Sequence, residues 1–293
     1  MSHSPTPLDS EALTLCRELA GHTFPWDINR ALELALLKTF CVPAISGLLH
    51  TTGEFEQRPR KRYDDTALMV AELLRHGPDS PIGSAVIRRM NGIHGHYAIG
   101  NEDFIYVLST FVAEPIRWLE RYGWRSLTPP EQQALFRFWR HVGGLMGIRH
   151  IPTTLQALMA WNQRVEDDVF RMAPSNQQVA EATLAMLLSD WPPLLRPALA
   201  GGLRGLLDPA VSGSLGWRPS PPWWRRGLQF GLRVRSRLNN RWQWLHPQRP
   251  LHFYSQQPTR SYGAHFTLEQ LGPPHLLEQL NGSSTPPCPS EEE

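Results

Sequence analysis

Several features that would identify a common protein class are missing from this sequence. Its three cysteines, Cys16, Cys41 and Cys288, are far apart and odd in number, which argues against a disulfide framework and a paired-cysteine zinc site. No stretch approaches the roughly 18 apolar residues of a membrane span. The N-terminus has no basic region followed by an apolar run, as a signal peptide would. We therefore expect a cytoplasmic protein, and peripheral attachment to a membrane stays open.

Motifs of the commonest hydrolases and nucleotide-dependent enzymes are also absent. There is no glycine-rich phosphate loop, no Gly-x-Ser-x-Gly turn and no His-Glu-x-x-His helix. The 27 acidic residues show no pair that faces inward together, as hydrolysis by two carboxylates would need. These absences argue against both enzyme classes.

Helical patterns dominate what is present. The chain has 293 residues, 41% of them apolar, which is enough for a sizeable core. No run of alternating apolar and polar residues predicts a strand. Capping signals predict helix starts at Asp27, at Ser80-Pro81 and at Thr128, where Glu131 completes a capping box. The sequence predicts an all-α fold with a single multi-helix domain.

Composition changes clearly only toward the ends of the chain. We expect an N-terminal arm with a short helix at residues 1–26 and a helical domain at 27–245. A proline-rich C-terminal extension follows at 246–280, and the segment 281–293 is expected to be a disordered acidic tail.

Positive charge is concentrated in one segment. Residues 218–260 contain nine arginines and no acid, so the rest of the chain carries only 20 of the 29 basic residues against all 27 acidic ones. Within this segment, residues 220–244 interleave arginines with aromatic residues on a predicted helix. The aromatic face could pack on the core, or the helix could contact an anionic membrane surface. The overall charge does not favour a nucleic-acid partner.

Two histidines lie near the end of a predicted helix, in Ile87-Arg-Arg-Met-Asn-Gly-Ile-His-Gly-His-Tyr97. At about 100° per residue, His94 falls on the apolar stripe of Ile87 and Met90, whereas His96 falls on another face. We therefore expect His94 to point inward and His96 outward. The stripe alone fits a core histidine bonded to a carbonyl, or an axial ligand to a metal or haem iron with His96 as the fallback.

A polar pair interrupts the apolar face of the helix predicted at about residues 60–76. Arg62 and Thr66 lie four residues apart, on the same face as Met69 and Leu73, so this face should be buried. A buried guanidinium needs a partner because an unpaired buried charge is strongly destabilising. The candidate partners are a haem propionate, a substrate oxygen, or an acidic side chain of the same helix, Asp64, Asp65 or Glu72.

These motifs together resemble those of the MpaB-type oxygenases and rubber oxygenases (latex clearing proteins), most closely the MpaB branch. They cover roughly residues 30–245, in the order and at the spacing of that family. The segments that carry the resemblance include Arg62-Tyr-Asp-Asp-Thr66, Met90-Asn-Gly-Ile-His94-Gly, Asn101-Glu-Asp-Phe-Ile-Tyr-Val-Leu108 and Phe138-Trp-Arg-His-Val-Gly-Gly-Leu-Met-Gly-Ile148.

The resemblance implies a globin-like core around haem b and a catalytic domain at residues 27–245. It implies cleavage or oxidation of a carbon–carbon double bond in an isoprenoid or other apolar unsaturated substrate, with dioxygen as co-substrate. The axial histidine of the family matches His94, and its distal arginine and threonine match Arg62 and Thr66. By this resemblance His94 holds the iron, while Arg62, helped by Thr66, stabilises negative charge that develops on oxygen.

The sequence departs from the family pattern in two places. Rubber oxygenases are thought to use a glutamate upstream of the arginine as a base, but residues 41–50 contain no carboxylate, and Glu54 and Glu56 are the nearest. Fungal MpaB proteins begin with a membrane-spanning helix that has no counterpart here, so their endoplasmic-reticulum location is not expected. Two other hypotheses are a non-catalytic haem- or lipid-binding helical protein and a membrane-surface protein whose haem site has decayed.

Overall fold

The computed structural model describes residues 8–245 and 250–282, without the side chains of 242–245. These residues form helices and turns with no strand, apart from one isolated bridge between Thr259 and Gly263. The predicted all-α fold with a single multi-helix domain is confirmed. The α-helices are α1 (Ser10–Glu18), α2 (Pro25–Thr39), α3 (Pro43–Thr52), α4 (Glu54–Gln57), α5 (Pro59–His76), α6 (Pro81–His94), α7 (Asn101–Tyr122), α8 (Pro129–Leu145), α9 (Leu155–Val169), α10 (Pro174–Leu188), α11 (Arg196–Leu206), α12 (Pro209–Ser214), α13 (Pro222–Leu245) and α14 (Leu277–Gly282).

Local capping chemistry explains where two of the central helices begin. The Ser80 hydroxyl accepts the Gly83 N–H at 2.9 Å and starts α6, with proline at the first helical position. Thr128 and Glu131 form the predicted capping box at the start of α8. Both helix starts therefore follow from residues that lie within four positions of each other.

The predicted cap at Asp27 is wrong. Helix α2 begins two residues earlier, at Pro25, and the Asp27 side chain is buried. Its carboxylate accepts a hydrogen bond from Trp118 Nε1 at 3.0 Å and pairs with Arg235 at 3.1 Å. Asp27 thus joins α2 to α7 and α13, because a buried carboxylate requires such partners.

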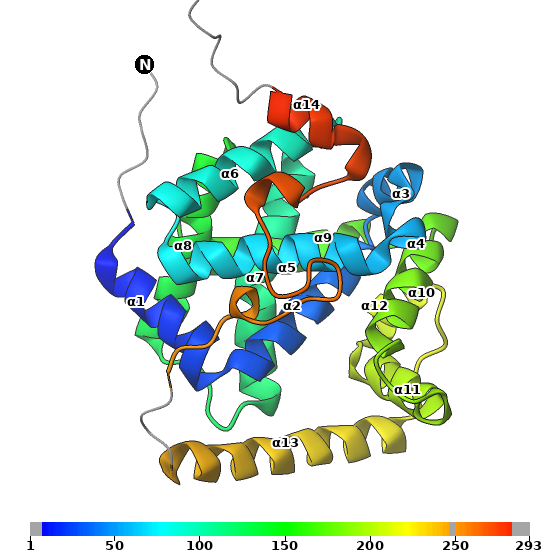
Figure 1. Ribbon diagram of the computed structural model, residues 1–293. Helices are drawn as coiled ribbons and strands as arrows, with labels where there is room; N and C mark the ends of the chain where they lie inside the picture. Colours follow the sequence, from blue (N-terminus) through cyan, green and yellow to red (C-terminus); the bar gives the residue numbers. More distant parts are fainter. Residues whose placement is uncertain (1–7, 246–249, 283–293) are drawn as a thin grey trace, which may run out of the picture.

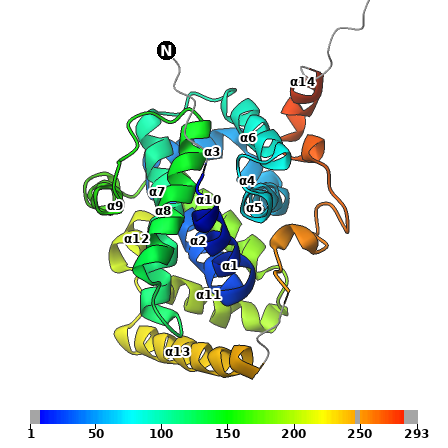
Figure 2. The same ribbon diagram turned by 90° about the vertical axis from the view of Figure 1, so that its left-hand side faces the viewer.

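Helix α7 is the centre of the core. It packs against α2, α8 and α9 (Figures 1 and 2) and buries residues such as Tyr106, Val112 and Trp118. Gly143 lets α8 approach α7 closely, since a Cβ there would lie 2.6 Å from a Leu108 methyl group. This contact sets the spacing of α7 and α8.

Helices α5 and α6 lie side by side, and the C-terminal segment crosses them (Figures 1 and 2). We call residues 250–282 the C-terminal strap. Helix α14 at its end includes residues 281 and 282, the first two of the expected tail. The rest of that tail and residues 246–249 of the expected extension lie outside the described residues.

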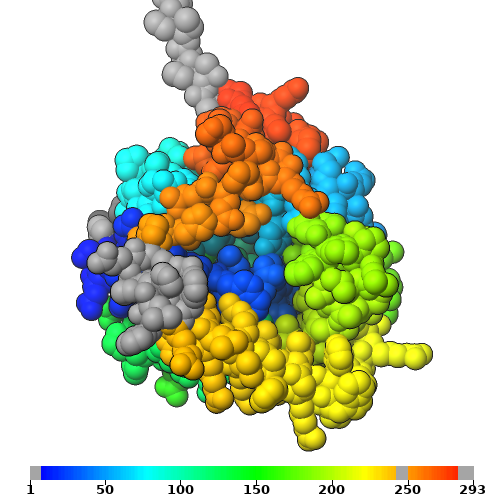
Figure 3. Space-filling view, turned by 60° about the horizontal axis from the view of Figure 1, so that its bottom comes forward, coloured from blue at the N-terminus to red at the C-terminus, as the bar shows by residue number. Residues whose placement is uncertain are grey.

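Helix α13 runs along one edge of the molecule, at the bottom of Figure 1. Seen from that side, it forms a band at the surface, beside a hollow that the strap and the green helices α10 and α11 also border (Figure 3). In the described ranges no single helix is long and apolar enough to cross a membrane. Helices α2 and α3 together meet that criterion by length and composition alone, but they meet at an angle of 95°.

Candidate functional site

Helix α5 carries Arg62 and Thr66 one turn apart, as the sequence predicts. The Arg62 guanidinium donates a hydrogen bond to the Thr66 hydroxyl and lies over the Phe55 ring, 5.2 Å from its centre. Burial lowers the pKa of Arg62, while the negative charges of Asp65 and Glu54 act in the opposite direction. The Arg62 cation is therefore desolvated, and the negative charges of Asp65 and Glu54 offset only part of the loss of solvation.

None of the acidic residues expected to pair with Arg62 does so. Asp64 binds the C-terminal strap instead. Asp65 pairs with Lys61 at 3.0 Å, and Glu72 pairs with residues of the last turn of α5. Arg62 forms no salt bridge with any residue that the structure describes, so an internal ion pair is excluded within this part of the chain.

His94 ends α6 and turns toward the interior, as the apolar stripe predicts. Its Nδ1 atom is buried, and neither ring nitrogen is hydrogen-bonded to a residue within 8–245 or 250–282. Phe104 of α7 packs edge-on against the imidazole, with the ring centres 5.4 Å apart. Burial, and secondly the positive charge of Arg62, lowers the pKa of His94 to about 4. The ring is therefore neutral at neutral pH.

His96 has the opposite environment. Its side chain is exposed, and its Nδ1 lies 2.8 Å from the carbonyl oxygen of Gly92 in the last turn of α6. An exposed imidazole that contacts the end of the neighbouring helix does not face the interior of the protein. Of the two candidate ligands, His94 is the one that faces the interior.

Arg62 and His94 come from neighbouring helices, and their charges influence each other. The charge of Arg62 affects the pKa of both His94 and Tyr97, so these groups lie within electrostatic reach of each other. The start of α6 packs tightly against the end of α5, since a Cβ on Gly83 would lie 2.0 Å from the Gly77 carbonyl oxygen. This contact positions the two helices that carry the site.

The structure distinguishes the two glutamates nearest to Arg62 in sequence. Glu54 is only 4% exposed, forms a bidentate pair with Arg58 at 2.7 and 3.0 Å, and acts electrostatically on Arg62. Glu56 is exposed and lies 2.8 Å from His50. Glu54 is therefore the carboxylate that belongs to the site, although both were equal candidates in the sequence.

His275 reaches the same place from the C-terminal strap, and sequence reasoning missed it. Its Nδ1 lies 3.7 Å from Glu54 Oε1, and its Nε2 lies 3.5 Å from the Tyr97 hydroxyl. No local pattern could have located this residue, because 178 positions separate it from Tyr97. Tyr97 itself falls on the same stripe as His94, and this pattern in the sequence could have indicated that Tyr97 belongs to the site.

The two acidic residues between Arg62 and Thr66 anchor the strap. Asp64 accepts hydrogen bonds from the hydroxyls of Tyr254 at 2.8 Å and Ser261 at 2.6 Å. Asp65 accepts one from Tyr262, which also contacts Lys61. Within this motif, Arg62 and Thr66 therefore face the site, whereas Asp64 and Asp65 bind the strap on another side of α5.

The side chains of this site suit an iron porphyrin better than a bare metal ion. Within the described ranges, no three His, Cys, Asp or Glu side chains lie close enough to hold a bare metal ion. A single unbonded imidazole such as that of His94 suits an iron whose other ligands come from a porphyrin. An unpaired guanidinium such as that of Arg62 suits a propionate or an oxygen atom. These residues fit haem.

Comparisons with known proteins agree on one family. The chain is similar to the ER-bound oxygenase mpaB′ of Penicillium brevicompactum, with 28% identity over 73% of this chain and 55% of the relative. It is also similar to the ER-bound oxygenase mpaB of that fungus, with 30% identity over 62% of this chain and 51% of the relative. The chain thus spans about half the length of these two curated relatives.

A solved structure, that of latex clearing protein in its closed state, shares the fold. The match has a TM-score of 0.57 at 18% identity and covers 79% of this chain and 69% of the other. Residues 31–237 match the family model described as the catalytic domain of ER-bound oxygenase mpaB/B′ and rubber oxygenase. This match contains Arg62, Thr66 and His94, and the chain belongs to the mpaB and rubber oxygenase family.

Proposed function

We propose that this chain is a haem-dependent oxygenase that cleaves or oxidises a carbon–carbon double bond of an isoprenoid or other apolar unsaturated substrate with dioxygen. The observation that carries the proposal is a neutral His94, with its buried Nδ1 unbonded, within electrostatic reach of Arg62, which has no salt bridge within the described ranges. Within the described ranges His94 Nδ1 has no hydrogen-bond partner and Arg62 has no counter-charge, and a ligand would supply both, because buried polar groups without a partner are destabilising. Membership of the family supports haem as that partner.

Each residue of the site has a definite task in this proposal. Bound haem would supply an iron centre for the chemistry of dioxygen. His94 would hold the iron, and its low pKa keeps the nitrogen lone pair available at neutral pH. Arg62 would stabilise negative charge on oxygen, with its guanidinium oriented by the hydrogen bond to Thr66. Phe104, packed on the imidazole, helps to exclude water.

Glu54 is the candidate for the base that the family resemblance implies. It is buried, and its charge acts on Arg62 through space, whereas Glu56 is exposed. A carboxylate here would accept a proton from an apolar substrate that has entered the site, and His275 and Arg58 would hold its orientation.

The proposal is tested by absorption spectroscopy of the purified full chain. The wild type is expected to show a Soret band after reconstitution with haem, His94→Ala to lose it, and His96→Ala to keep it. A colourless wild type that takes up no haem would exclude the proposal. Loss of the band in His96→Ala alone would reassign the ligand.

Oxygen uptake separates turnover from binding. With unsaturated isoprenoids, Arg62→Ala should keep the Soret band but slow uptake by about 10²-fold or more, as expected for loss of a group that stabilises developing charge. Unchanged uptake in this variant would remove Arg62 from the mechanism. A wild type that binds haem without any uptake would favour the alternative, a non-catalytic haem- or lipid-binding protein.

A further inference from the structure

Helix α13 has an inner face that fixes it to the body. Trp224 Nε1 donates to the carbonyl oxygen of Gly201 in α11 at 3.0 Å. Arg235 pairs with the buried Asp27 at 3.1 Å. Arg225 pairs with an acid at the start of α12. These contacts hold the helix in one orientation, so its outer face is presented in a defined way.

The outer face of α13 carries an apolar stripe that the fold leaves in solvent. Trp223 is 70% exposed, Phe230 69% and Leu238 63%, with Val234 between the last two. These residues lie 7, 11 and 15 positions after Trp223, which places them on one side of an α-helix. Large apolar side chains in a row on a surface indicate an interaction site.

A row of arginines runs beside this apolar stripe. Arg226, Arg233 and Arg237 follow one another after seven and four positions, as the first three residues of the apolar stripe do. All three are exposed. Arg226 and Arg237 form no salt bridge with a residue in the described parts of the chain, and Arg233 bonds only to a backbone carbonyl, that of Arg121. The row therefore has its positive charge free for a partner.

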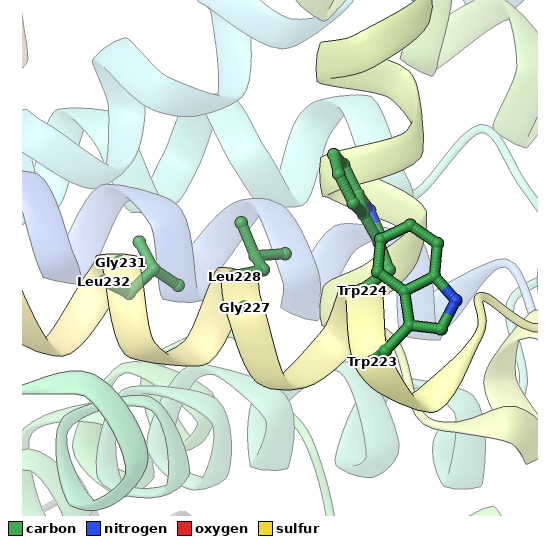
Figure 4. A pocket seen from close by; sticks show the side chains of 6 residues that line it. All are labelled: Trp223, Trp224, Gly227, Leu228, Gly231 and Leu232. Atoms are coloured by element: carbon green, nitrogen blue, oxygen red, sulfur yellow. The ribbon is translucent and has the colours of Figure 1, made fainter.

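A shallow groove runs along α13 from Trp223, and Figure 4 shows the side chains that line it. Gly227 and Gly231 leave it open, and no atom of a neighbouring residue would meet a Cβ at either position. The groove can therefore receive a hydrocarbon chain alongside the stripe. Its lining residues are Trp223, Trp224, Gly227, Leu228, Gly231 and Leu232.

We propose that the outer face of α13 docks on an anionic lipid bilayer, with its apolar stripe in the interface and its arginine row on the lipid head groups. A helix with exposed aromatic and aliphatic residues flanked by arginines is typical of such binding. The charge distribution orients the contact, because residues 218–260 contain nine arginines and no acid while the rest of the chain has an excess of acids. A second copy is less suited, since a symmetric contact would bring two arginine rows together.

Vesicle flotation of the full chain tests this docking surface. The protein should float with phosphatidylcholine vesicles that contain about 30% phosphatidylserine, and hardly with phosphatidylcholine alone. Arg226→Gln/Arg237→Gln should weaken binding about tenfold or more. Trp223→Ser/Phe230→Ser/Leu238→Ser should weaken it by a similar factor of about ten.

The matched controls remove equivalent groups elsewhere on the surface. Arg88→Gln/Arg140→Gln deletes two exposed arginines of α6 and α8, and Met172→Ser deletes an exposed apolar side chain. Both should bind vesicles like the wild type. Circular dichroism of every variant verifies that the fold is kept, as expected for changes at exposed positions.

Several outcomes would overturn the proposal. Equal binding to neutral vesicles would remove the role of the arginines, and unchanged binding in both α13 variants would place the contact elsewhere. A dimer in light scattering that the serine variant abolishes would make a second copy the occupant. The partner of α13 would be nucleic acid if the protein bound a DNA or RNA oligonucleotide but no vesicles, and if Arg226→Gln/Arg237→Gln abolished that binding.

Discussion

The lack of an ion pair at Arg62 contrasts with a cluster of paired charges between α2, α7 and α9. Lys38 lies between Glu114 at 2.8 Å and Glu166 at 3.0 Å, and Arg117 binds the same two carboxylates at 2.8 and 2.9 Å. Each of these two cations therefore has two carboxylate partners, which offset the cost of removing its charge from water. At Arg62 the described residues supply only the Thr66 hydroxyl, which leaves the guanidinium available to a ligand.

Replacing Glu54 tests its proposed role at the scale of one residue. Glu54→Gln keeps the size of the side chain but removes the basic oxygen, so oxygen uptake with an unsaturated isoprenoid should fall by about 10²-fold or more while the Soret band is kept. Glu56→Gln is the matched control, because that neighbouring carboxylate is exposed, and it should leave uptake unchanged. Equal rates for wild type and Glu54→Gln would show that Glu54 serves only to hold Arg58 and His275.

At the scale of the element, the capping box of α8 makes stability depend on pH. Burial raises the pKa of Glu131, but hydrogen bonds from Arg125 and from the backbone and hydroxyl of Thr128 outweigh it, so the pKa is lowered overall. A lowered carboxylate pKa stabilises the fold above the unfolded-state value of about 4.5, and this stabilisation is lost as the pH falls through the lower folded-state value.

Glu131→Gln should therefore lower the free energy of unfolding at pH 7 by about 1–2 kcal/mol and flatten its decline below about pH 4.5. Urea unfolding curves at a series of pH values measure both effects. Glu120→Gln, at an exposed position of α7, should change neither. A pH profile for Glu131→Gln that is parallel to that of the wild type would rule out this linkage.

At the scale of the whole molecule, the C-terminal strap lies beyond the family match at residues 31–237 but packs on the helices of the site. Arg89 of α6 is the main link between α6 and the strap. Its buried guanidinium donates to the carbonyl oxygens of Leu271 and Glu269, both at 2.7 Å, and to Asn281 Oδ1 at 2.9 Å. The strap is therefore part of the folded unit that holds α6 in place.

Arg89→Gln should destabilise the protein by about 2–3 kcal/mol, because the buried carbonyl oxygens of the strap lose a charged donor. It should also speed hydrogen exchange at residues 268–282. Arg88→Gln, at the exposed neighbouring position, is the control and should match the wild type in both measurements. Unfolding and exchange that are unchanged in Arg89→Gln would mean that the strap contributes little to the fold.

The sequence by itself determined that the fold is helical, where α6 and α8 begin, and the direction in which His94 points. These features depend on residues within about four positions of each other, through hydrogen-bond spacing and side-chain periodicity. The failed cap at Asp27 shows the limit of such reasoning. Its carboxylate binds Trp118 and Arg235, which lie 91 and 208 positions away, and no local sequence pattern indicates these partners.

Only the tertiary structure decided which groups meet. It left Arg62 without an acidic partner in the described chain, brought Glu54 rather than Glu56 to the site, and added His275 from the strap. On α13 it buried part of Trp224 against α11 and left Trp223 in solvent, although the two are adjacent in sequence. The physical reason is the same in each case, because burial and pairing depend on contacts between segments that are distant in sequence.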